Sequence, residues 1–156
     1  MVDHARVECQ NHRFTYNEPM RVGALTQAVC DLALSFGEDG ENKDSKMSRP
    51  FGTALLVAGH DDLGPQLFMA DPSGSFIRYK AKAIGSGSEG AQQTLQESYS
   101  DAFTLDEAST LALTTLKAVM EDKITSDNVE LATVTEAGGY VLKDAAGLKA
   151  LLDALP

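Results

Sequence analysis

The stretch "TALLVA" at residues 53–58 constrains the fold most, because both of its faces are apolar. If this stretch is a strand, alternate side chains point to opposite sides of the sheet. One side then carries Thr53, Leu55 and Val57, and the other carries Ala54, Leu56 and Ala58. Both sides need to be shielded from water. Helices of this chain can cover one side. The other side needs a late strand hairpin, or strands that this sequence does not contain.

The periodicity of the remaining sequence predicts a helix pair, a strand meander, a second helix pair, a strand hairpin and a last helix. Strands that follow strands favour an antiparallel α+β fold over a βαβ array. The expected helices cover residues 1–14, 22–36, 88–100, 104–123 and 144–155. The expected strands cover residues 51–59, 65–71, 75–80, 81–86, 128–135 and 138–143.

Local signals define several element ends. "DPSG" at 71–74 fits a type I turn, with Asp first, Pro second and Gly fourth. "TLDE" at 104–107 has the spacing of a capping box, and Asp144 can cap the last helix. The first helix has no start signal, since no capping residue precedes its apolar pattern. The second helix has an apolar stripe at steps of three and four: Val22, Leu25, Val29, Leu32 and Phe36.

The length of 156 residues fits a single domain, 1–156. The formal net charge of −10 argues against a nucleic-acid or anionic-membrane partner, because phosphates would be repelled. No apolar run approaches the ~20 residues of a membrane span, and the charged first residues are unlike a signal peptide. Two cysteines, Cys9 and Cys30, give no disulfide framework and suit a reducing compartment.

The stretch "AIGSGSEGA" at 83–91 raises the question of nucleotide binding, because Gly85, Gly87 and Gly90 have G-x-G-x-x-G spacing. Asp106 lies ~20 residues further on, about where a dinucleotide-binding protein has the acidic residue that binds the ribose. However, another helix is expected next instead of a parallel strand, and Asp106 falls in its first turn. Glu89 would also repel a phosphate at the start of the preceding helix. We expect the glycines to allow a sharp turn and close packing of the helix on the sheet.

His4, Glu8 and His12 recur every four residues and so share one face of the first helix. They could hold a metal ion, but the pattern is not H-E-x-x-H and no fourth ligand is near in sequence. Cys9 lies three residues before His12, yet a catalytic dyad also needs an orienting group and an oxyanion site. The favoured interpretation is a solvated face with Cys9 as a half-buried apolar residue, and no metal or cofactor.

Two serines, Ser86 and Ser88, lie among the glycines. Gly87 occupies the position that the serine of a nucleophile elbow would take. Capping of the following helix is the expected role of both serines, since Ser86 and Glu89 have capping-box spacing. The charged loop 38–46 is interpreted as a solvated loop, with docking of a partner as an unsupported alternative. No catalytic residue is predicted.

Several stretches resemble alpha-type subunits of the 20S proteasome, above all those of type 5. "RPFG" at 49–52, followed by an apolar strand, is similar to a signature of these subunits. "DPSG" and "AIGSGSEGA" are similar to the turn, strand and helix start that come next in the family. "ARVECQNHRFTYNEPM" is similar to its first long helix, and "ELATV" at 130–134 extends the match. The resemblance covers essentially the whole chain, with its motifs in order.

The resemblance implies the four-layer α/β/β/α sandwich of N-terminal-nucleophile hydrolases, here incomplete. It also implies a non-catalytic subunit of the outer ring that supports ubiquitin-dependent protein degradation in the cytoplasm and nucleus. The implied partners are other alpha subunits, beta subunits and regulatory particles that dock on the alpha ring, with no nucleic acid and no membrane. The family's nucleophile is an N-terminal threonine, whereas this chain begins Met1-Val2, and valine has no hydroxyl or thiol.

Family members carry a pore-facing tail, a short helix and the first strands of one sheet before this first helix. This chain lacks that portion, its first helix has no capping residue, and its strand at 53–58 is apolar on both faces. For these three reasons we expect an N-terminally truncated subunit. Two other functions stay open on the sequence alone. One is a hydrolase with its own N-terminal nucleophile, and the less favoured one is a small nucleotide-binding domain that uses Gly85–Gly90.

Overall fold

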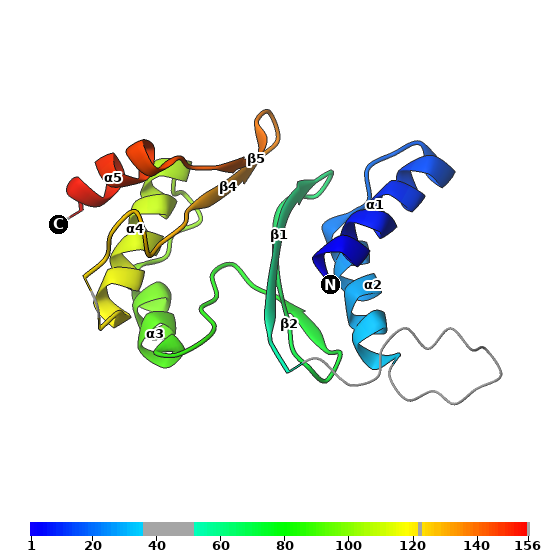
Figure 1. Ribbon diagram of the computed structural model, residues 1–156, viewed down its shortest axis with the longest axis horizontal. Coiled ribbons are helices and arrows are strands. Elements are labelled where there is room, and N and C mark those ends of the chain that lie inside the picture. Colours follow the sequence, from blue (N-terminus) through cyan, green and yellow to red (C-terminus); the bar gives the residue numbers. More distant parts are fainter. Residues whose placement is uncertain (36–51, 122, 156) are drawn as a thin grey trace. The chain divides into compact units, whose positions relative to one another are not determined.

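The computed structural model describes residues 1–35, 52–121 and 123–155 (Figure 1). They form two compact units, Met1–Lys80 and Ala81–Pro156, and each is described by itself. Both units combine helices with antiparallel strands, which confirms the α+β class. Phe36, the charged loop 38–46 and most of the "RPFG" stretch lie outside the described residues.

The first unit contains two helices and a three-stranded antiparallel sheet. The helices are α1 (Val2–Tyr16) and α2 (Val22–Leu34). The sheet has the order β1-β2-β3. Its strands are β1 (Leu55–Asp61), β2 (Gly64–Ala70) and β3 (Phe76–Arg78). Three of the four expected strands of the meander therefore form, each with shifted or shorter ends.

Helix α2 contacts all three strands of this sheet. Its buried residues are Val22, Thr26, Val29, Cys30 and Ala33. The expected stripe is thus only partly correct, because Leu25 and Leu32 are half-buried at its margins. Smaller side chains occupy the centre of the contact, since the helix lies very close to the sheet.

Two glycines allow this close approach. A Cβ atom on Gly59 of β1 would lie 2.6 Å from Val22 Cγ2. A Cβ atom on Gly74, in the turn between β2 and β3, would lie 2.5 Å from Leu34 Cγ. Val22 and Leu34, at the two ends of α2, therefore pack directly against glycines. Any other residue at Gly59 or Gly74 would place a Cβ atom in the space that these side chains occupy.

The turn between β1 and β2 holds the N-terminal end of α2. The Asp61 carboxylate accepts hydrogen bonds from the Val22 N–H and from the Leu63 N–H, each at 3.0 Å. The Arg21 guanidinium donates from Nε to Asp62 Oδ1 at 2.9 Å and from Nη2 to Asp62 Oδ2 at 2.5 Å. Helix α2 has no capping side chain of its own, so Asp61 serves as its cap from a distant part of the chain.

The other face of this sheet is apolar and is not covered by α2. Cross-strand partners share a face, so Leu56, Met69 and Ile77 lie on the side opposite to Gly59. Leu56 is 39% exposed and Ile77 is 58% exposed. The strand that includes "LLVA" therefore carries apolar residues on both faces, as its sequence indicated.

The second unit contains three helices and a two-stranded hairpin. The helices are α3 (Ser88–Ser98), α4 (Leu105–Val119) and α5 (Ala145–Asp153). The hairpin pairs β4 (Ala132–Thr135) with β5 (Gly139–Leu142). Its core is formed by Leu113, Val129 and Leu148, with these partly buried residues around them: Met120, Ile124, Leu131, Leu151, Leu152 and Leu155.

Three of the local signals at the element ends are confirmed, in the "DPSG" turn and at the starts of α4 and α5. In the "DPSG" turn the Gly74 N–H donates to the Asp71 carbonyl at 3.1 Å. In the capping box the Thr104 hydroxyl accepts from the Glu107 N–H at 3.4 Å, and the Glu107 carboxylate accepts from the Thr104 N–H at 2.7 Å. Asp144 caps α5 through its side chain.

The strand expected at residues 81–86 does not form. The side-chain amide of Gln92 bonds to this segment instead. Its Oε1 accepts from the Ala83 N–H at 3.1 Å, and its Nε2 donates to the Ala81 carbonyl at 3.4 Å. The Gln92 side chain therefore takes backbone hydrogen bonds that a neighbouring strand would otherwise form.

Replacing Gly59 tests the close approach of α2. Gly59→Ala is expected to lower the free energy of unfolding by about 1–3 kcal/mol, because Val22 has to shift to admit the methyl group. Gly52→Ala is the matched control, since a Cβ atom there would meet nothing within 4 Å. Urea unfolding measures both variants, and an unchanged midpoint for Gly59→Ala would contradict the contact.

The capping box predicts a dependence of stability on pH. Hydrogen bonds from the Thr104 N–H, and then from its hydroxyl, lower the pKa of Glu107 below its ordinary value of 4.5. The ionised Glu107 carboxylate therefore stabilises the folded chain fully above pH 4.5, and this contribution is lost as the pH falls through the lowered pKa. Glu107→Gln keeps an acceptor but does not titrate, so it should flatten this part of the acid dependence.

Glu121→Gln is the control for this prediction, because it removes one carboxylate outside the capping box. Denaturant unfolding at a series of acidic pH values compares the two variants with the wild type. Equal acid dependence in all three proteins would show that the capping carboxylate contributes nothing.

Candidate functional site

The glycine loop, residues 85–90, leads into α3. Gly85 and Gly87 have positive φ angles of 97° and 73°, whereas Gly90 lies within the helix. A Cβ atom on Gly87 would lie 3.3 Å from Val119 Cβ, so the loop rests against the end of α4. The expected roles in turning and close packing are therefore present, but the partner is a helix and not a sheet.

Ser86 does not cap α3, so the expected capping box of Ser86 and Glu89 is wrong. The N-cap residue is Gly87, and no side chain bonds to the helix start. Because Gly87 takes the left-handed conformation, the helix begins one residue later than the serine spacing requires. The Ser88 N–H donates instead to the Gly85 carbonyl, at 3.3 Å, and closes the turn.

The other parts of a nucleotide fingerprint are not brought together. Helix α3 is followed by α4, whose first turn contains Asp106, and the sheets of the described residues are antiparallel. Glu89 lies in the first turn of α3, where a phosphate would bind. A hollow of about 460 Å³ beside this turn is lined by Lys82, Ala83, Ser88, Glu89, Gln92, Gln93 and Gln96. The Glu89 carboxylate would repel a phosphate group at this helix start.

His4, Glu8 and His12 share one side of α1, as their spacing predicts, but this side is half-buried, so the interpretation of a solvated face is wrong. His4 Nε2 lies 3.7 Å from Glu8 Oε1, and His12 Nε2 lies 3.6 Å from Glu18 Oε1. The His12 ring also contacts the Tyr16 ring, with centroids 4.7 Å apart. Each histidine thus has its own carboxylate. In the described ranges, no three His, Cys, Asp or Glu side chains are placed to hold a metal ion.

Neither cysteine has the environment of a nucleophile. Burial raises the pKa of the Cys9 thiol, and the neighbouring Glu8 raises it further. Burial also raises the pKa of Cys30, with smaller contributions from Asp31 and Asp71. Both groups therefore remain protonated at neutral pH, whereas a nucleophilic cysteine needs a lowered pKa.

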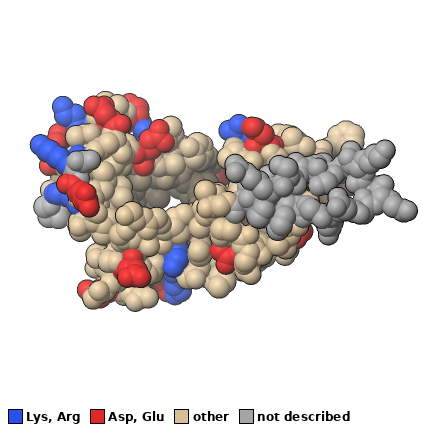
Figure 2. Space-filling model, turned by 60° about the horizontal axis from the view of Figure 1, so that its bottom comes forward, with Lys and Arg blue, Asp and Glu red and all other residues tan. Residues whose placement is uncertain are grey.

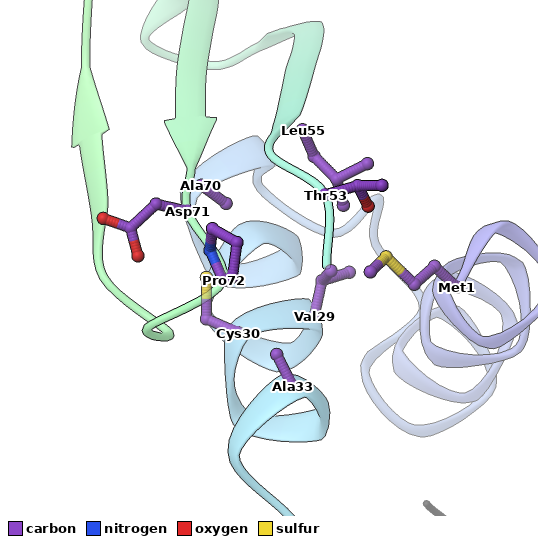
Figure 3. A pocket seen from close by; sticks show the side chains of 9 residues that line it. All are labelled: Met1, Val29, Cys30, Ala33, Thr53, Leu55, Ala70, Asp71 and Pro72. Atoms are coloured by element: carbon purple, nitrogen blue, oxygen red, sulfur yellow. The ribbon is translucent and has the colours of Figure 1, made fainter. Parts of the chain in front are cut away.

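A small cavity lies between α2 and the end of the sheet (Figure 3). Its volume is about 10 Å³, which is at most the space that one water molecule needs. Most of the labelled side chains around it are apolar, including Val29, Ala33 and Leu55. The cavity is a packing gap and has no room for a substrate.

The sequence did not predict that several apolar residues of α1 are exposed to solvent. This helix has no fully buried residue, and Phe14 is 94% exposed, Val2 66% and Val7 54%. The half-buried side carries the two histidines and Glu8 together with Ala5 and Cys9. The spacing of four between these polar residues was the signal that could have shown which side faces inward.

Within the described residues, no helix is both long enough and apolar enough to cross a membrane. Figure 2 shows acidic and basic side chains mixed over the face in view rather than gathered into one basic patch. The net charge of the chain is −10. The described residues in this view therefore form no basic patch that would attract the phosphates of a nucleic acid.

Two alanine variants separate a packing role of the glycine loop from nucleotide binding. Gly87→Ala is expected to lower the free energy of unfolding by about 1–3 kcal/mol, because alanine disfavours positive φ. Gly90→Ala should be neutral or stabilising, since it lies inside the helix and the nearest contact of a Cβ atom would be 3.9 Å. Urea unfolding measures both. Calorimetry with NAD and ATP should show no binding, and heat that disappears in both variants would favour a nucleotide site.

Comparison with known proteins identifies the family. The model of the family described as "Proteasome subunit" matches residues 1–134. The chain is 61% identical over 137 residues to proteasome subunit alpha type-5 of Dictyostelium discoideum, covering 88% of this chain and 57% of that protein. It is 54% identical over 137 residues to the subunit of the same name from Drosophila melanogaster, covering 87% and 56%.

A third relative, proteasome subunit alpha type-5 of Trypanosoma brucei brucei, is 52% identical over 139 residues, covering 89% of this chain and 56% of that protein. The chain therefore spans somewhat more than half the length of these relatives. Because the family model matches most of its residues, the chain belongs to the proteasome subunit family.

Proposed function

We propose that this chain is a non-catalytic structural subunit of the outer alpha ring of the 20S proteasome core particle. The observation that carries the proposal is its identity of 52–61% to alpha type-5 subunits over nearly nine-tenths of its length. Such identity supports a shared fold and a shared place in an assembly. The role would be to support ubiquitin-dependent protein degradation in the cytoplasm and nucleus.

The proposed partners are neighbouring alpha subunits, beta subunits, and the regulatory particles that dock on the alpha ring. Exposed apolar residues support contacts with other protein chains. On α1 they include Phe14, which is 94% exposed, and on β5 they include Tyr140, which is 71% exposed. Large apolar side chains that project into water are a frequent sign of an interaction surface.

For the fold, we propose that residues 1–156 form part of one four-layer α/β/β/α sandwich. The β1–β3 sheet supports this, because it has α2 on one face and apolar residues such as Leu56 and Ile77 on the other. An inner face that packs against a second sheet has this composition. With five strands in the described residues, the sandwich would be incomplete in this chain.

The proposal assigns no peptidase activity to the chain itself. The raised pKa values of Cys9 and Cys30 oppose a thiol nucleophile. Purified chain should therefore cleave no peptide. Cleavage that persists after contaminating proteasome has been removed would contradict this.

Sedimentation in cell extracts tests the proposed assembly. The chain, tagged at Pro156 and expressed at native level, should migrate with a very large particle that degrades peptides. A tagged unrelated protein of similar size is the control and should remain in the light fractions. Migration of the chain only as a small species or an aggregate would contradict the proposal.

A further inference from the structure

We draw no further inference here: the strongest candidate, the apolar surface patch of Leu56, Met69 and Ile77 on the open face of the β1–β3 sheet, carries nothing because the part of the chain that the structure describes does not show what covers it.

Discussion

The first unit depends on the close approach of α2 to the β1–β3 sheet. Gly59 and Gly74 leave space for Val22 and Leu34, and the Asp61 carboxylate caps the helix from the neighbouring turn. These interactions fix the two ends of α2 on the same sheet. Because that face is filled, the apolar residues on the opposite face remain available for a further layer, as a sandwich fold would require.

Packing rather than chemistry explains the stretches that most resembled functional sites. The glycine loop turns the chain at Gly85 and Gly87 and lets it rest on Val119. The histidines of α1 are each paired with a glutamate, and the cysteine thiols have raised pKa values. Several apolar side chains, among them Phe14 and Tyr140, also point outward, and exposed apolar surface suits the proposed role in assembly.

The features that could be predicted from the sequence were mostly contacts between residues close together in the chain. The Thr104–Glu107 capping box and the Asp144 cap are contacts over three residues, and their spacing predicted both. The same spacing failed for Ser86 and Glu89, because Gly87 takes the left-handed conformation and becomes the N-cap of α3. Contacts between distant segments were not predictable in this way. The buried stripe of α2 includes Thr26 and not the predicted Leu25. Its position depends on Gly59, on a distant strand, which lets the helix lie close to the sheet. The strand expected at 81–86 is absent because Gln92 takes its hydrogen bonds.

The central claim is that the chain is a structural component of the proteasome ring, and the composition of the particle tests it most directly. Active 20S particles would be purified from cells that express the chain at native level, and its peptides quantified by mass spectrometry against those of the other alpha subunits. The account predicts peptides from across residues 1–156 at the same stoichiometry as the other alpha subunits. Their absence from active particles would contradict it.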